Sequence, residues 1–327
     1  MIATLGCFTY ALSGCAPPAP PVVPLRSLPQ LPLVALRAHR SGQIFNYAFT
    51  TLDNQADPTF NRLLGINNLG KISGYYGSGA TGHPNRGYVV YRPYGPNNFR
   101  NENYPGASDT QVTSLNNKRT IAGLYVARHG AIFGFVQTKG IWSSYKDPHL
   151  RKGDGSVTEL LGLSDSGLAV GFYTATSGAS FNQGFELDEP SGKFHNINPP
   201  GAKSAAASGI NTKGDIVGFL TRSDDHVAGF LLKGGLFTEF SYPRATATQA
   251  LGVNYQDQIA GTYVDRSGAS HGFVLTNPLS KDPTWQSIDD PNGKGKTVVT
   301  SINNHHDLVG YYVDRYGNTD GFLAVPK

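Results

Sequence analysis

The sequence predicts an all-β chain, a six-bladed β-propeller built from four-stranded antiparallel blades. Three observations lead to this prediction. The 327 residues include 40 Gly, 17 Tyr and 17 Phe but only 15% charged residues, a composition typical of short strands joined by tight turns. A pattern with a period in the forties occurs six times, with four strand-sized pieces in each copy. The strands expected at the two ends of the chain also complement each other.

Each copy of the repeat carries a glycine between β-branched or aromatic residues. The six anchor glycines are Gly74, Gly123, Gly171, Gly218, Gly261 and Gly310. Seven residues before them stand Asn67, Asn116, Ser164, Asn211, Asn254 and Asn303. A glycine-aromatic pair follows each anchor, at Gly87-Tyr88, Gly134-Phe135, Gly184-Phe185, Gly229-Phe230, Gly272-Phe273 and Gly321-Phe322. In five copies an aromatic residue then precedes a proline by six positions, in the pairs Phe99 and Pro105, Trp142 and Pro148, Phe194 and Pro200, Phe237 and Pro243, and Trp285 and Pro291.

Each landmark predicts one strand of a blade. The first strand ends at an Ile-Asn pair such as Ile210-Asn211, and a turn with Gly214 follows, because Asn and Gly tolerate positive φ. The second strand contains the anchor glycine, which suggests close approach of the backbone of a neighbouring blade. The third strand contains the glycine-aromatic pair. The fourth strand is expected to run from the aromatic residue to the proline, where pairing should stop.

The two ends of the chain predict a closed ring. After Gly321-Phe322 the chain stops without a fourth strand, whereas residues 49–53 supply a fourth strand that lacks a blade. Leu52 follows Phe49 by three positions, as Ile288 follows Trp285. The N-terminal strand should therefore complete the last blade of a domain that spans residues 44–327. An open β-solenoid of the same repeats is the alternative, and the split blade disfavours it.

The N-terminal segment predicts export. Residues 1–14 are largely apolar and uncharged, and Leu12-Ser13-Gly14-Cys15 resembles the lipobox of bacterial lipoproteins. This resemblance implies that Cys15 is lipidated and becomes the first residue of the mature chain, although no Lys or Arg stands at the start. The alternative is an ordinary secretory signal with an unrelated cysteine. Residues 15–43 contain seven prolines and predict an extended tether, so the protein should face the periplasm or the cell surface.

The repeat resembles the HAF-type repeats of bacterial extracellular proteins. The likeness rests on Ile66-Asn67-x-x-Gly70-x-Ile72-x-Gly74-x-Tyr76 and on His271-Gly272-Phe273, and it covers nearly all of residues 64–325. The chain departs from that pattern in having Gly in place of the middle Ala and His in one copy alone. The resemblance implies an exported repeat protein and no particular reaction.

Several functional classes are disfavoured by composition. Both cysteines, Cys7 and Cys15, precede the repeats, so no disulfide or cysteine-zinc site is expected within them. A net charge of +4, with Lys and Arg scattered among Asp and Glu, argues against a nucleic-acid binder. No apolar stretch is long enough for a membrane-spanning helix, so contact with the membrane is expected through the lipid alone. No cofactor is expected.

Candidate ligand-binding residues gather where the second strand meets the third and where one blade meets the next, connections that share one face of a propeller. They are Arg128, His129, Arg222, Asp224, Asp225, His226, Asp265, Arg266, His271, Asp314, Arg315 and Asp320, with Asp109, His149, Arg151, Asp154 and Arg244 from the links between blades. Arg, Asp and His together suit an acidic sugar, a carboxylate or a divalent ion. The alternative is that Asp-x-x-Gly segments are turns with solvated charges. The segment 224–226 is the densest metal-like cluster, and it would need partners from other loops.

Three functions remain open. The first is a binding or scaffold module at the cell envelope, whose partner is a glycan, a peptide or an envelope protein. The second is a polysaccharide hydrolase or lyase. The five glutamates argue against it, because most lie in or beside predicted third and fourth strands, away from the ligand face. The third is a structural envelope protein without a small-molecule site. A propeller does not decide among them, and the sequence favours a protein that is not an enzyme.

Overall fold

The computed structural model describes residues 44–150, 157–174 and 181–327, within a compact unit that spans Gly42–Lys327. This part of the chain consists of 24 β-strands and one 3-10 turn, η1 (Pro96–Asn98), so the prediction of an all-β chain is confirmed. Cys15, Arg151 and Asp154 lie outside the described residues. None of the helices in those ranges has the length and the hydropathy to cross a membrane.

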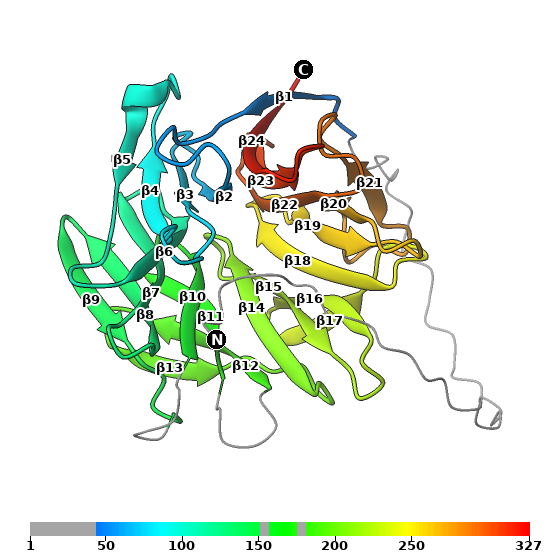
Figure 1. Cartoon of the computed structure of the whole chain (residues 1–327). Coiled ribbons are helices and arrows are strands. Elements are labelled where there is room, and N and C mark those ends of the chain that lie inside the picture. The colour runs from blue at the N-terminus through cyan, green and yellow to red at the C-terminus, as the bar shows by residue number, and fades with distance from the viewer. Residues whose placement is uncertain (1–43, 151–156, 175–180) are drawn as a thin grey trace, which may run out of the picture. The chain divides into compact units, whose positions relative to one another are not determined.

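The strands form antiparallel groups of four, which we number 1 to 6 along the chain (Figure 1). Group 1 contains β2 (Asn61–Ile66), β3 (Ile72–Tyr76), β4 (Arg86–Val90) and β5 (Phe99–Asn101). Group 2 contains β6 (Asp109–Leu115), β7 (Thr120–Val126), β8 (Ile132–Thr138) and β9 (Ile141–Tyr145). Group 3 contains β10 (Val157–Leu163), β11 (Leu168–Thr174), β12 (Asn182–Asp188) and β13 (Lys193–Asn196).

The second half of the chain repeats this order. Group 4 contains β14 (Ser204–Ile210), β15 (Ile216–Thr221), β16 (Val227–Lys233) and β17 (Leu236–Phe240). Group 5 contains β18 (Ala247–Val253), β19 (Ile259–Val264), β20 (Ser270–Thr276) and β21 (Thr284–Ile288). Group 6 contains β22 (Thr297–Ile302), β23 (Leu308–Val313), β24 (Thr319–Pro326) and the N-terminal β1 (Tyr47–Thr51).

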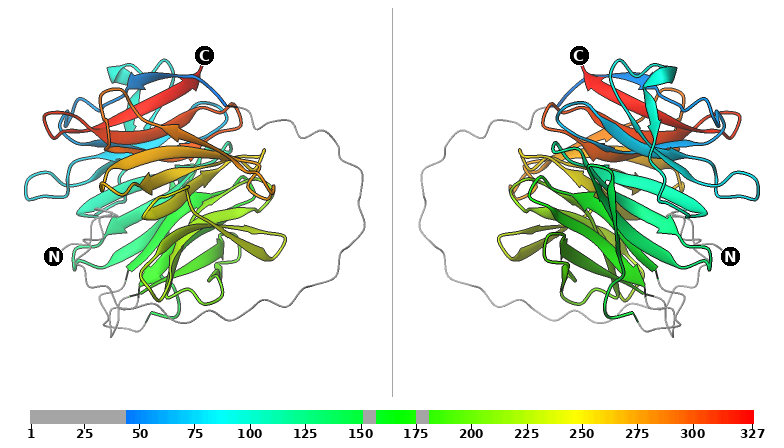
Figure 2. Two further views of the ribbon diagram at one scale, coloured as in Figure 1. Left: turned by 90° about the vertical axis from the view of Figure 1, so that its right-hand side faces the viewer. Right: turned by 90° about the vertical axis from the view of Figure 1, so that its left-hand side faces the viewer.

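Strand β1 completes group 6, as the sequence predicts. It pairs antiparallel with β24, with Phe49 opposite Ala324, and in group 5 Trp285 stands opposite Leu275 at the equivalent position. The ring of Phe49 lies 5.6 Å from that of Phe322. Figure 2 shows the blue β1 along the red β24 in both side views. The first and last strands of the described chain therefore share one sheet.

The first strands of successive groups contact each other in a cycle, because β22 contacts β2 as β2 contacts β6. Single parallel bridges reinforce four junctions within the described residues, between groups 2 and 3, 4 and 5, 5 and 6, and 6 and 1. The bridging pairs are Ile132 with Val157, Val227 with Ala247, Ser270 with Lys296, and Thr319 with Phe60. The junction of groups 6 and 1, where the two chain ends meet, therefore has the same kind of contact as the junctions between consecutive groups.

Hydroxyl side chains on the first strands cross three of these four junctions. Thr113 Oγ1 donates to the carbonyl of Leu160 at 2.7 Å, and Ser208 Oγ donates to that of Ala250 at 2.6 Å. At the junction of the chain ends, Thr300 Oγ1 donates to the carbonyl of Leu63 at 2.8 Å. Each bond satisfies a buried backbone group and contributes on the order of 1 kcal/mol.

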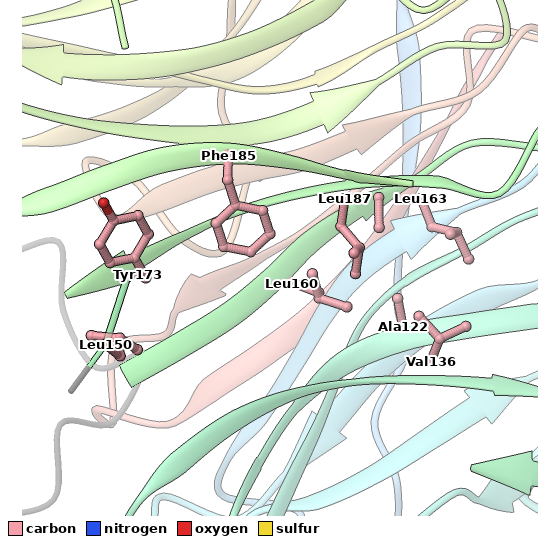
Figure 3. Packing of buried hydrophobic residues seen from close by; sticks show 9 residues of the cluster. Ala122, Val136, Leu150, Leu160, Leu163, Tyr173, Phe185 and Leu187 are labelled. Carbon is pink, nitrogen blue, oxygen red and sulfur yellow. The ribbon is translucent and has the colours of Figure 1, made fainter. Parts of the chain in front are cut away.

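The third strand supplies the core. Its aromatic residue is fully buried in all six groups, at Tyr88, Phe135, Phe185, Phe230, Phe273 and Phe322. Figure 3 shows the cluster between groups 2 and 3, in which Phe185 and Leu160 pack near Val136. Burying one such side chain stabilises the fold by roughly 1.5–3 kcal/mol.

The anchor glycines require a correction. A Cβ atom at Gly123 would lie 2.0 Å from the carbonyl oxygen of Gln111 and 2.9 Å from the Phe135 ring. Both residues belong to group 2 itself, so the close approach does not come from a neighbouring blade. The glycine is needed because the buried ring of the third strand covers it within one sheet.

The ends of the fourth strands also differ from the prediction. β21 ends at Ile288, before Pro291 is reached. The reason is that the chain already bends toward the next group, where the backbone N–H of Asp290 donates to Thr297 Oγ1 at 3.1 Å. Pairing therefore stops where the link to the next first strand begins.

Candidate functional site

The structure has two faces that differ in their connections. We call the loop face the one formed by the connections between second and third strands and by the links between groups. The turn face is formed by the hairpins that join first to second and third to fourth strands. The sequence-predicted ligand residues lie on the loop face.

The segment 224–226 is an exposed turn. The backbone N–H of Asp225 donates to the Arg222 carbonyl at 3.0 Å, and that of His226 donates to Asp224 Oδ1 at 3.1 Å. The carboxylate of Asp225 pairs with Lys203 Nζ at 2.7 Å. Within the described ranges no three His, Cys, Asp or Glu side chains are arranged to hold a metal ion.

A second set of predicted residues comes together around His271. Its Nδ1 lies 2.8 Å from Asp289 Oδ1, and its Nε2 lies 3.5 Å from Asp265 Oδ2. Asp265 also accepts hydrogen bonds from the Ser267 hydroxyl and from the N–H of Ala269, at 2.6 and 3.0 Å. These bonds, that of Ser267 foremost, lower the pKa of Asp265 to about 2. Asp265 thus closes its turn and also faces His271.

The remaining predicted residues are dispersed. Asp314 Oδ1 accepts the N–H groups of Tyr316 and Asn318 at 2.8 and 2.9 Å, which is turn chemistry. Asp320 is buried, and this burial raises the pKa of its carboxyl. Four predicted residues are exposed on turns: Arg128, His129, Arg266 and Arg315. Arg222 pairs with Glu239 of β17.

One of the five glutamates lies on a first strand and is buried, a role that the sequence did not reveal. Glu159 is on β10, the first strand of group 3, and only 3% of it is exposed. Burial raises the pKa of its carboxyl to about 8, and its Oε2 has no hydrogen-bond partner within the described residues. The repeat offers one sign of this: Glu159 stands five residues before Ser164, and Arg62 stands five residues before Asn67, so both occupy the same first-strand position.

A large recess lies on the turn face, between groups 1 and 2. We call it the cationic cleft; its volume is about 820 Å³. Its apolar floor consists of Val89, Leu115 and Ile121, which are buried. The polar part of its lining consists of Lys71, Tyr91, Arg100, Glu102, Lys118, Arg119, Gln137, Lys139 and Gly140. Sequence reasoning missed this cleft because its residues come from hairpins of two repeats and from the face opposite the predicted one.

The only carboxylate in the lining of the cleft is already engaged. Glu102 is 8% exposed, pairs with Arg100 Nε at 3.0 Å and accepts a hydrogen bond from Gln137 Nε2 at 2.9 Å. Burial raises the pKa of this carboxyl. Lys71 Nζ lies 5.0 Å from the centre of the Tyr91 ring. The other three cations of the lining form no ion pair within the described residues.

Comparison with known proteins gives remote likenesses. No model of a protein family matches the chain, nor does any curated protein sequence. Among solved structures, TolB from Acinetobacter baumannii is 9% identical, with a TM-score of 0.46, and the match covers 78% of this chain and 63% of that one. The chain thus spans less than two thirds of that TolB chain.

Two further solved structures give similar values. A variant of the Aleuria aurantia lectin, in complex with Fucα1-6GlcNAc, is 9% identical with a TM-score of 0.49, and the match covers 82% of this chain and 96% of the lectin. A variant of AofleA from Arthrobotrys oligospora is 12% identical with a TM-score of 0.48, covering 85% and 83%. At these identities and scores, no likeness assigns a function to this chain.

Proposed function

We propose that the chain is an exported, lipid-anchored, six-bladed β-propeller that acts as a binding or scaffold module at the cell envelope. The six groups correspond to the blades, and β1 closes the ring. Support for closure comes from the junction of groups 6 and 1, where Thr300 bonds to Leu63 as Ser208 bonds to Ala250. A closed ring leaves no strand edge between first and last blades, which gives a rigid scaffold for variable surface residues.

The observation that carries the binding role is the cationic cleft. It is a concave recess that combines an apolar floor with three cations that form no ion pair within the described residues. Binding sites are commonly concave and mix apolar lining with a few placed polar groups. The loop face remains a second predicted surface, with His271 between two carboxylates as its best-organised part.

The test is thermal unfolding of the full-length chain with separate panels of divalent ions, EDTA, neutral and acidic oligosaccharides, and peptides. A ligand at about a hundred times its dissociation constant adds roughly 2.7 kcal/mol, which should raise the midpoint by several degrees. A reproducible shift with one class supports the binding role. A midpoint that no panel moves would contradict it and leave a structural role.

A further inference from the structure

We propose that the cationic cleft between groups 1 and 2 binds an acidic oligosaccharide, a sugar chain with carboxylate groups. This inference rests on the proposed binding function and names its ligand class and site. It differs from the sequence prediction in placing the ligand on the turn face. The argument comes from charge, from a matched junction in the same molecule and from the shape of the lining.

The charge of the cleft is not neutralised from within. Five Lys and Arg side chains meet one carboxylate, and Arg100 and Gln137 hold that carboxylate at 3.0 and 2.9 Å. Burial, and then the nearby charge of Arg119, lower the pKa of Lys71. Placing cations together costs free energy unless an anion compensates. A ligand with several carboxylates would supply that compensation.

At the junction of groups 4 and 5, the charged side chains at the equivalent positions neutralise one another. Asp215 occupies the position of Lys71, four residues after the landmark asparagine, and Asp257 occupies that of Arg119, three residues after it. At that junction, Lys233 Nζ pairs with Asp215 at 3.2 Å and with Asp257 at 2.6 Å.

Lys213 also pairs with both aspartates of the 4–5 junction. Two lysines and two aspartates therefore form a closed network there. In the cationic cleft, Lys71 and Arg119 stand where the 4–5 junction has its two aspartates. The two junctions therefore have the same arrangement of strands but differ in net charge. This contrast is the strongest indication that the cleft receives an external anion.

The lining favours a sugar chain over a peptide. Peptide recognition usually needs a free strand edge or deep pockets for apolar anchors. Here Val89, Leu115 and Ile121 are 3%, 7% and 6% exposed, so the floor offers little apolar surface to an anchoring side chain. Arg and Lys in the lining can instead bond the carboxylates of a sugar chain, Arg in bidentate fashion.

The test is calorimetric titration of the full-length chain with oligogalacturonates, compared with neutral oligosaccharides of equal length. We expect binding of the acidic chains alone, with an affinity that falls as salt rises, because rim charges are screened. The double variant Lys71→Asp with Arg119→Asp places the two aspartates of the 4–5 junction at the equivalent positions of the cleft. It should weaken binding by at least about tenfold, since it removes two cations and adds two anions.

A matched control is Lys193→Asp with Lys281→Asp, which makes the same change in net charge at exposed positions outside the cleft. It should bind like the unmodified chain. The milder pair Lys118→Gln with Lys139→Gln tests the cleft again should the first variant fail to fold, which its melting curve would reveal.

The outcomes separate this inference from the proposed function. Equal affinity in the cleft variants and the control, or tighter binding of neutral sugars, peptides, single-stranded DNA or anionic vesicles, overturns the ligand assignment and leaves a binding module. The absence of binding by any probe overturns both.

Discussion

At the scale of single residues, the landmark asparagines do more than the sequence suggests. Asn67 was expected to favour a turn, and its Oδ1 does accept the N–H groups of Leu69 and Lys71 at 3.0 and 2.9 Å. Its Nδ2 donates to the carbonyl of Asn116 in the next group at 3.0 Å. Asn303 Nδ2 donates to the carbonyl of Asn67 at 3.3 Å across the junction of the chain ends. One side chain thus caps a turn and joins two groups.

The buried carboxyl of Glu159 should make the free energy of unfolding depend on pH. Its pKa is raised from 4.5 to about 8 in the folded chain, so the folded state retains a proton that the unfolded state releases. The stabilising effect is complete below about pH 4.5 and is lost as pH rises through about 8. Between these values the free energy of unfolding should fall by roughly 1.4 kcal/mol per pH unit for this proton.

The measurement is urea unfolding at several pH values between 5 and 9, roughly the range of that titration. Glu159→Gln should remove this part of the decline, because the amide does not ionise. Glu186→Gln, on β12 of the same group and partly exposed, is the control that should keep it. If Glu159→Gln and the unmodified chain show the same pH dependence, the carboxyl does not keep its proton.

At the scale of elements, β1 shows how a strand remote in sequence replaces a local one. Phe49 packs on Phe322 as Phe237 packs on Phe230, at 5.6 and 5.7 Å between ring centres. Thr51 Oγ1 lies 2.9 Å from the Tyr312 hydroxyl, where Ser287 meets Tyr263 in group 5. The strand therefore brings the side chains that a local fourth strand would bring.

Phe49→Ala is expected to lower the free energy of unfolding by about 1–3 kcal/mol. This lies below the usual cost for a fully buried phenylalanine, because Phe49 is only partly buried. Thr50→Ala changes an exposed residue of the same strand and should cost less than about 0.5 kcal/mol. Denaturant unfolding of both variants measures the difference. Equal effects would mean that β1 does not contribute a packed side chain.

At the scale of the whole molecule, export and anchoring are proposals that concern residues outside the described part. The lipobox-like Leu12-Ser13-Gly14-Cys15 and the proline-rich residues 15–43 support them. Two or more acyl chains anchor a protein stably, at roughly 0.8 kcal/mol per buried CH₂. The proline-rich segment would then hold the folded unit away from the membrane.

Cys15→Ser should move the protein from the membrane fraction to the soluble fraction of the cell envelope or to the medium. The reason is that a serine hydroxyl at this position cannot replace the thiol in lipid attachment. Fractionation, with radiolabelled fatty acid to follow acylation, measures the outcome. Cys7→Ser is the control, and it should leave acylation unchanged. Retention of both label and membrane association in the Cys15 variant would exclude this cysteine as the anchor.

The sequence by itself determined the order of the strands within each repeat and the pairing of β1 with β24. These follow from side-chain alternation, turn residues and aromatic spacing, which act within one repeat and recur in the next. It left open whether the Asp-rich segments are ligand sites or structural turns. The segments around Asp224 and Asp314 form the hydrogen bonds of turns.

Only the tertiary structure decided which side chains meet between groups. Lys71 and Arg119 come from hairpins of different repeats, and their shared cleft depends on how two sheets pack. The partner of Asn67 is a carbonyl 49 residues away. Glu159 looks like any strand residue until the surrounding groups bury it and raise its pKa. Local sequence encodes backbone geometry, whereas burial and charge are set by every group that surrounds a residue.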